Sequence, residues 1–375
     1  MVQSRVPCVI MRGGTSKGVF FKKADLPSSK SEMTDVILRV FGSGDPMQID
    51  GLGGTHAQTS KTMVVSRSKQ PGVDVDYLFG QVEVERKSVD YRGNCGNLTS
   101  AVGPFAIDEG LFRARGSSTK VRLFNTNTRK RVDASVQLEG GKTKYEGNYF
   151  IDGVPNPGAR IDVTWYDPGG AVTGALFPTG NVVDRIPVQG RAIQASVVDA
   201  SNPVVFVRAE DVGMKGTELP DDVSQDTLRK SELIRSKVCE MIGLVKEAGE
   251  ATSKSPHIPF IAVVANPQNY TTSTGARITR HEYNVLPRLF SMQKMHHAYA
   301  VTGAICTAVA ATIPGTIVNE RSRAPAGRVV IAHPKGLIDV AVQSHSNHKG
   351  AVVDSVTVGR TARRLMAGSA FYIKD

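Results

Sequence analysis

Two stretches of small, uncharged residues decide the fold: Leu98-Thr-Ser-Ala-Val-Gly-Pro-Phe-Ala-Ile107 and Ala300-Val-Thr-Gly-Ala-Ile-Cys-Thr-Ala-Val-Ala-Ala-Thr-Ile-Pro-Gly315. A helix that has no polar face is one that is surrounded by protein. Each stretch therefore predicts a buried central helix. We expect the first helix to begin at the turn Gly93–Asn97, and Pro104 to bend it or to divide it into two segments.

The two stretches belong to a weak repeat that extends over the chain. Val19–Leu26 resembles Val205–Val212, because each is a strand followed by a basic residue, an alanine, an acid and an apolar residue. We interpret this as a duplicated α+β fold with two lobes, although short apolar strands also resemble one another by chance. The N-terminal lobe is predicted to comprise residues 1–184 plus 358–375, and the C-terminal lobe residues 185–357.

The segments around the two central helices show strand and helix patterns. The pattern predicts strands at 6–11 and 19–21, and a helix over Thr34–Phe41 with Thr34 as its N-cap and Gly42 as its stop. It also predicts a strand pair over Val73–Val84, an amphipathic helix over Asp226–Leu244, and a strand followed by a helix carrying Arg363 and Arg364 over 350–374.

Composition narrows the class of protein. The 375 residues include 46 Lys and Arg against 35 Asp and Glu, a net charge of +11, but no block of five or six cations. Nucleic-acid binding is therefore not expected, and the charge suits the attraction of small anions. The longest apolar stretch is too short to cross a membrane, and no signal-peptide core is present, so we expect a cytoplasmic protein without membrane partners.

The four cysteines, Cys8, Cys95, Cys239 and Cys306, lie far apart in the sequence. This spacing argues against a disulfide framework and a zinc site, and the histidine pairs also lack metal spacing. We expect no metal and no cofactor. Cys95 stands out because Gly-Asn turns flank it at the start of a buried helix, where backbone N–H groups favour a thiolate or bind an anion. A packed structural cysteine is the alternative.

Two glycine-rich segments carry the other candidates. Gly13-Gly14-Thr15-Ser16-Lys17-Gly18 lacks the spacing of a phosphate loop, but its N–H groups and hydroxyls suit a carboxylate. An ordinary hairpin turn is the alternative. Lys61 lies two residues before Met63-Val64-Val65. Apolar surroundings would favour a neutral amine that acts as a base, and a surface lysine is the alternative.

Six motifs in order resemble the PrpF family: Ile10-Met-Arg-Gly-Gly-Thr-Ser-Lys-Gly-Val-Phe-Phe, Gly51-Leu-Gly-Gly, Thr59-Ser-Lys, Asp76-Tyr-x-Phe-x-Gln-Val, Gly93-Asn-Cys-Gly-Asn and Ser291-Met-Gln-Lys-Met-His-His. The resemblance covers nearly the whole chain. It implies a diaminopimelate epimerase-like fold, with two pseudo-repeat lobes, each a β-barrel-like sheet wrapped round a central helix, and an active site in the cleft between them.

The resemblance also implies a cofactor-free isomerase that transfers a proton along small unsaturated di- or tricarboxylates. It makes Lys61 the general acid/base and Cys95 the second catalytic residue. Donors for the developing dienolate are then expected in the turn Gly13–Ser16 and at two helix starts, with Arg12 neutralising a carboxylate. The expected substrate-binding residues are Arg12, Gly13, Gly14, Thr15, Ser16, Ser60, Asn94, Gly96, Asn97, Thr302 and Gly303.

Two other functions stay open. A two-base epimerase would need a second thiol, but the matching turn Val301-Thr302-Gly303-Ala304 has none, and Cys306 is expected to pack inside its helix. The second open function is that of a non-catalytic accessory protein that supports an aconitase-like dehydratase. Several polycarboxylates, and both double-bond migration and cis-trans isomerisation, fit the sequence. A homodimer and a monomer fit it equally.

Overall fold

The structure, a computed structural model, describes residues 2–323, 327–347 and 350–374. These residues form two compact units: unit 1 is Met1–Thr164 with Gly359–Asp375, and unit 2 is Trp165–Val358. From the sequence we expected the first boundary between the units twenty residues later, at 184/185, and the second boundary at 357/358. The segment after residue 164 is tied to unit 2 by Asp199, whose carboxylate accepts hydrogen bonds from the N–H groups of Val172 and Thr173.

Unit 1 is built on a sheet in which β9, β7, β6, β4, β3, β2, β1 and β21 follow one another. The pairs β2–β3 and β4–β6 are parallel, whereas β1–β2, β1–β21, β3–β4 and β6–β7 are antiparallel. The strands are β1 (Val2–Gly13), β2 (Ser16–Lys22), β3 (Lys61–Arg67), β4 (Val75–Val82), β5 (Val89–Asp90), β6 (Ser118–Asn125), β7 (Lys130–Glu139), β8 (Lys142–Thr143), β9 (Ile161–Tyr166) and β21 (Ala362–Lys374).

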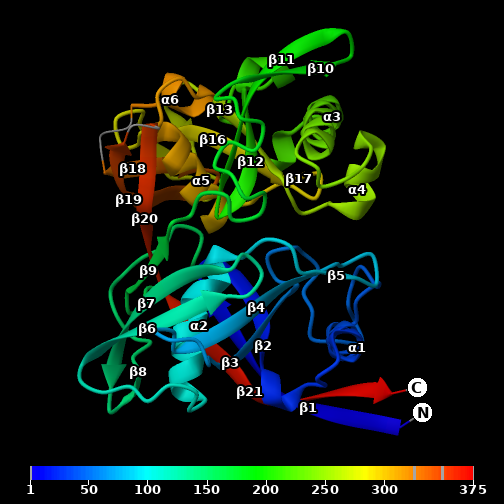
Figure 1. Cartoon of the computed structure of the whole chain (residues 1–375), viewed down its shortest axis with the longest axis vertical. Coiled ribbons are helices and arrows are strands. Elements are labelled where there is room, and N and C mark those ends of the chain that lie inside the picture. The colour runs from blue at the N-terminus through cyan, green and yellow to red at the C-terminus, as the bar shows by residue number, and fades with distance from the viewer. Residues whose placement is uncertain (1, 324–326, 348–349, 375) are drawn as a thin grey trace. The chain divides into compact units, whose positions relative to one another are not determined.

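The predicted central helix of unit 1 is α2 (Gly96–Asp108), which is buried from Gly96 to Ile107. It packs against strands β1, β2, β3 and β7 (Figure 1). Pro104 lies inside this helix and does not divide it into two segments. The small side chains let the strands approach α2 from several sides, so the prediction of a buried helix is confirmed.

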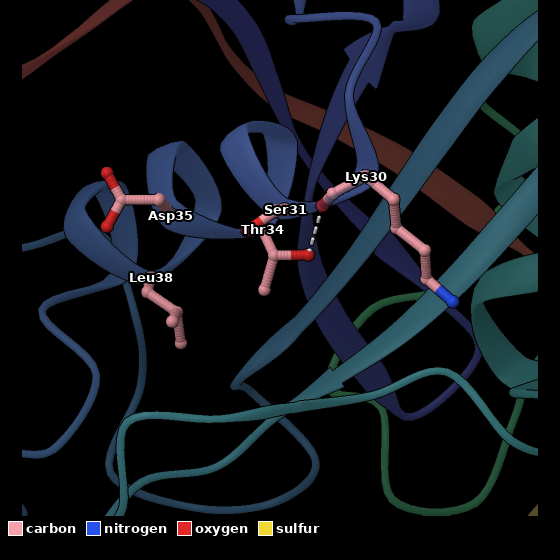
Figure 2. Close-up of a pocket in the computed structure, with 5 residues that line it drawn as sticks. All are labelled: Lys30, Ser31, Thr34, Asp35 and Leu38. Carbon is pink, nitrogen blue, oxygen red and sulfur yellow. Dashed lines mark hydrogen bonds between the residues drawn. The ribbon is translucent and has the colours of Figure 1, made fainter.

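The surface helix of unit 1 is α1 (Lys30–Phe41), one turn longer than predicted. Its N-cap residue is Ser29, so the prediction of Thr34 as N-cap is wrong; the Thr34 hydroxyl instead donates to the carbonyl of Lys30 at 2.7 Å. Gly42 ends the helix in the left-handed conformation, as expected. Beside α1 lies an open hollow of about 500 Å³, lined by Lys30, Ser31, Thr34, Asp35 and Leu38 (Figure 2).

Two sequence predictions for strands are wrong. Residues 350–374 form two strands, β20 (Gly350–Arg360) and β21, instead of a strand and a helix. Pairing along β1, from Val2 opposite Lys374 to Gly13 opposite Ala362, overrides the local helix propensity of β21. The segment Val73–Val84 forms one strand, β4, instead of a pair.

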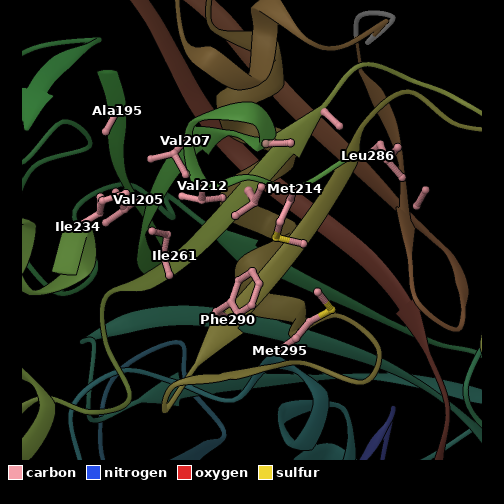
Figure 3. Close-up of a cluster of buried hydrophobic side chains, with 14 of the residues drawn as sticks. Ala195, Val205, Val207, Val212, Met214, Ile234, Ile261, Leu286, Phe290 and Met295 are labelled. Atoms are coloured by element: carbon pink, nitrogen blue, oxygen red, sulfur yellow. The ribbon is translucent and has the colours of Figure 1, made fainter. Parts of the chain in front are cut away.

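Unit 2 contains a six-stranded sheet in the order β10-β11-β12-β13-β16-β17, and the antiparallel run β18-β19-β20. Its strands are β10 (Asp184–Val188), β11 (Arg191–Ala200), β12 (Asn202–Arg208), β13 (Phe260–Ala265), β14 (Tyr270–Thr271), β15 (Arg277–Ile278), β16 (Leu286–Ser291), β17 (Lys294–Met295), β18 (Arg328–His333) and β19 (Gly336–Asn347). One core cluster of this unit gathers side chains of β11, β12, β13 and β16, including Val205, Ile261 and Phe290 (Figure 3).

The second predicted central helix is α5 (Val301–Thr312), buried from Val301 to Ala311 and packed on β11, β12, β18 and β19. The amphipathic helix is α3 (Gln225–Met241), which begins at an N-cap serine, Ser224. Short helices α4 (Ala251–Lys254) and α6 (Ile317–Glu320) complete the unit. Each unit thus pairs sheets with one small-residue helix, as the repeat predicted. Among the residues that the structure describes, no helix is long and apolar enough to cross a membrane.

Candidate active site

Lys61 is the first residue of β3 and lies opposite Gln81 of β4 in the antiparallel register. Its ammonium donates a hydrogen bond to Oε1 of Gln81. The amide Nε2 of Gln81 in turn donates to the carbonyls of Ser60 at 2.9 Å and Ala57 at 3.2 Å. Those two bonds fix the orientation of the amide, so its oxygen faces the lysine.

The Lys61 side chain is 7% exposed, and its nitrogen lies 5.3 Å from the ring centroid of Phe79. Burial lowers the pKa of Lys61 below its ordinary value, because an ammonium loses its hydration there; Cys95 and Glu83 oppose the shift. Glu83 is itself buried, and burial raises the pKa of its carboxyl. The surroundings therefore favour a neutral amine, yet offer acceptors once the amine gains a proton.

Cys95 is the N-cap residue of α2 and is 7% exposed. Its thiol donates to the hydroxyl of Ser16 over 4.0 Å. The first N–H groups of α2, at Gly96 and Asn97, have no carbonyl partner within the helix and favour a negative group at this end. Cys95, Ser16 and these amides therefore form one anion-favouring corner.

Strand β3 and helix α2 meet across Gly18 of β2. A Cβ atom at Gly18 would lie 2.6 Å from the carbonyl oxygen of Lys61 and 2.7 Å from Cδ1 of Leu98. Only glycine allows this approach. The approach brings the lysine strand and the cysteine helix together, and it agrees with the electrostatic effect of Cys95 on Lys61.

The turn before Ser16 holds the start of α2. The N–H of Gly14 donates to the carbonyl of Thr361 at 2.9 Å, and the N–H of Thr15 donates to Oδ1 of Asn97 at 3.2 Å. The Asn97 amide donates back to the Thr15 hydroxyl at 3.1 Å. These two turn N–H groups, which we expected to be free for a substrate carboxylate, are thus engaged within the protein. Gly13, paired with Ser16 across the hairpin, packs directly on α2.

The Arg12 guanidinium contacts the same turn. Its Nη1 donates to the carbonyls of Gly14 and Thr361, each at 3.0 Å. Burial, and then the neighbouring Arg363, lower the pKa of Arg12 to about 10. Arg12 therefore stands near the cysteine helix as a half-buried cation.

Ser60 and Asn94 are buried behind the site. The Ser60 hydroxyl accepts a hydrogen bond from Nε2 of Gln48 at 3.0 Å, and Oδ1 of Asn94 lies 3.3 Å from the Thr99 hydroxyl. The Thr99 hydroxyl also lies 3.3 Å from the hydroxyl of Tyr77, whose pKa burial raises to about 12. These contacts hold the site residues in place.

The sequence predicts no site role for Tyr77, Phe79, Gln81 or Glu83. A signal was present, because Tyr77, Phe79 and Gln81 occupy alternate positions of one strand and so share a face. Only the register with β3 shows that this face meets Lys61.

Thr302 and Gly303 lie in unit 2, in the first turn of α5, whose N-cap is Ala300. Nδ2 of Asn202 donates to the Thr302 hydroxyl at 3.1 Å. Cys306 is fully buried, its thiol donates to the carbonyl of Val198 at 3.1 Å, and burial raises its pKa. Cys306 is thus packed as expected, whereas substrate binding by Thr302 and Gly303 stays a prediction.

The described residues contain no group of three or more His, Cys, Asp or Glu side chains placed to hold a metal ion. The hollow beside α1 (Figure 2) is lined by residues of that helix, and its lining includes neither Lys61 nor Cys95.

Comparison with known proteins gives consistent matches over the whole chain. A family model described as PrpF protein matches residues 3–373. The 3-methylitaconate isomerase of Eubacterium barkeri is 46% identical, over 99% of this chain and 98% of that one. The 2-methyl-aconitate isomerase of Shewanella oneidensis is 40% identical, over 98% and 96%.

Solved structures agree with the fold. The crystal structure of a methylitaconate-delta-isomerase superposes with a TM-score of 0.81 at 45% identity, over 99% of this chain and 96% of that one. A hydroxyproline epimerase from Agrobacterium vitis shares the fold at a TM-score of 0.60 and 10% identity, over 99% and 93%. The predicted epimerase-like α+β fold is confirmed.

Proposed function

Because the chain belongs to the PrpF family and is an isomerase, we propose that it moves a double bond within a small unsaturated di- or tricarboxylate by transferring one proton over three carbons. The observation that carries this proposal is the buried Lys61 amine, held by Gln81 and close to Cys95. The named relatives act on methylitaconate and methyl-aconitate, which are carboxylates of this class.

The proposed reaction begins with the neutral amine of Lys61. The amine takes a proton from the carbon next to a substrate carboxylate, and the electron pair of that C–H bond spreads over the double bond and the carboxylate. The Lys61 ammonium then returns a proton to the third carbon of the allyl system, and the double bond moves by one position. Atoms and charges balance, since the lysine ends the cycle as it began.

Both charges of the intermediate have partners in this proposal. The new ammonium is stabilised by Oε1 of Gln81, the face of Phe79 and the nearby Glu83. The dienolate is stabilised by the N–H groups at the start of α2 and by the hydroxyl and thiol of Ser16 and Cys95. A low-dielectric site strengthens both interactions.

The test is deuterium exchange in heavy water, followed by proton NMR with a panel of unsaturated di- and tricarboxylates. We expect solvent deuterium to enter one of them, and Lys61→Ala to lower this rate by about 10²–10⁴-fold. Lys69→Ala, which removes an exposed lysine of the same unit, is the control. Undiminished exchange in folded Lys61→Ala would refute the assignment of the base.

The panel also separates the other functions. Product analysis distinguishes double-bond migration from cis-trans isomerisation. An accessory protein would give no turnover without its partner enzyme. A two-thiol epimerase is not supported, because Ala300 occupies the N-cap position of α5 that corresponds to Cys95, and Cys306 is bound to a backbone carbonyl.

A further inference from the structure

We propose that Arg360 binds a second carboxylate of the substrate, one that is not attached to the carbon that loses its proton. This inference rests on the proposed function for its substrate class. Arg360 ends β20, is 5% exposed, and donates through Nη1 to the carbonyl of Gly359 at 2.9 Å. Its Nε is buried and has no hydrogen-bond partner.

Two other arginines have acidic partners. Arg235 is 1% exposed and has an acidic partner, Glu232, at 2.6 Å. Arg364, four residues after Arg360, contacts Glu109 at 2.6 Å. Among the described residues, no carboxylate forms an ion pair with Arg360. A buried cation without an anion is costly, and burial lowers the pKa of Arg360 to about 10.

Arg360 lies beside the start of α2. A Cβ atom at Gly14 would lie 3.1 Å from Cδ of Arg360 and 2.1 Å from Oδ1 of Asn97, so both side chains flank this glycine. Asn97 follows Cys95 by two positions in the chain. The arginine stem is therefore adjacent to the anion-favouring corner, and the φ of +49° at Gly14 favours glycine there.

Further cations and polar groups surround Thr361, the next residue. Arg12 donates to the Thr361 carbonyl, and Arg363 acts electrostatically on Arg12. The Thr361 hydroxyl is buried without a partner. In the described part of the chain, none of the three arginines Arg12, Arg360 and Arg363 forms an ion pair. A guanidinium fork matches the two oxygens of a carboxylate. Because Arg360 would bind one carboxylate while the other stays on the reacting carbon, the site selects substrates with at least two carboxylates.

The experiment measures binding without turnover. Succinate, a saturated dicarboxylate, and succinamate, its monoamide, are titrated by calorimetry into the full chain and into Arg360→Met. We expect the wild type to bind succinate about 10–100-fold more tightly than succinamate, since a hydrogen bond to a charged group contributes about 1.5–3 kcal/mol. This preference is expected to disappear in Arg360→Met.

The controls separate charge, folding and catalysis. Arg5→Met removes an exposed arginine from β1 and should keep the preference. If Arg360→Met does not fold, Arg360→Lys takes its place; it keeps the charge but loses the fork, and we expect a weaker preference. Lys61→Ala should lose turnover and keep the preference, so failure of the proposed base and failure of this carboxylate site are distinguishable.

Three outcomes would overturn the proposal. They are undetectable succinate binding by the wild type, an unchanged preference in folded Arg360→Met, and an unchanged preference in Arg360→Lys where the methionine variant does not fold. An unsaturated dicarboxylate that is turned over adds a kinetic test: its KM should rise in Arg360→Met by the same factor as the succinate dissociation constant, with a smaller effect on kcat.

Discussion

Helices α2 and α5 pack in the same way within their units, but they carry different residues at their first positions. Both consist of small residues and are buried against the strands of their own unit. In each helix a threonine donates to the carbonyl four residues earlier: Thr99 to Cys95 at 2.9 Å and Thr307 to Gly303 at 2.8 Å.

The same threonines contact a buried tyrosine in each unit. Thr99 bonds to Tyr77 at 3.3 Å, and Thr307 bonds to Tyr299 at 2.9 Å. Burial raises the pKa of both tyrosines. This recurrence shows that the framework is repeated, so these contacts do not distinguish the two helices.

The two helices differ at their first residues. The N-cap of α2 is Cys95, and a buried lysine lies nearby; the N-cap of α5 is Ala300, and its cysteine lies in the second turn. The comparison teaches that two units with a repeated framework can differ in the residue types at the start of the central helix. Three predictions test this difference, beginning with the largest effect.

Replacing each of the two cysteines by serine, one at a time, should separate their roles. We expect Cys95→Ser to lower turnover by about 10–10³-fold, because the sulfur lies in the anion-favouring corner. Cys306→Ser should keep turnover within about twofold and lower stability by about 1 kcal/mol, since it buries a more polar group. Steady-state kinetics and thermal unfolding measure both. Equal kinetic losses would contradict the asymmetry.

Removing the acceptor of the Lys61 ammonium should change the pH profile. Gln81→Leu takes away the oxygen that favours the charged form, so the pKa of Lys61 falls further. The rise of kcat/KM with pH should then move to lower pH, while kcat falls by about tenfold because the ammonium intermediate is less stable.

The opposite charge provides the matched comparison. Gln81→Glu should move the same rise to higher pH, because a carboxylate favours the ammonium. Profiles that coincide with that of the wild type in both variants would show that Lys61 does not govern the reaction rate.

The smallest expected effect concerns stability. The folded-state pKa of Lys61 lies below the ordinary 10.5, so between these values the unfolded chain binds a proton that the folded chain does not. Wild-type stability should therefore fall, relative to Lys61→Met, as pH decreases from 10.5. We expect the methionine variant to be more stable by about 0.5–2 kcal/mol at neutral pH.

Thermal unfolding at several pH values between 7 and 10 measures this difference. The gap should narrow as pH rises, because both states of the wild type then become neutral at this residue. A wild type that is more stable than Lys61→Met at neutral pH would indicate a charged, well-paired lysine.

The local sequence pattern predicted those helices that are buried on all sides or have one apolar and one polar face. The buried helices α2 and α5 and the amphipathic α3 follow from residue size and period alone. The prediction was wrong for β21, where pairing with β1 outweighs helix propensity, and for the N-cap of α1, where Ser29 and Thr34 both offer a hydroxyl. Local sequence does not encode a distant strand partner.

The sequence by itself determined the repeated small-residue helices, the reactive residue types at Lys61 and Cys95, and the family motifs around them. Tertiary structure alone decided that Gln81 faces Lys61, that the turn amides of Gly14 and Thr15 are already bonded, and that Arg360 lies beside this turn. The physical reason is that solvation and hydrogen bonding depend on which distant segments meet, and strand register and close packing fix those meetings.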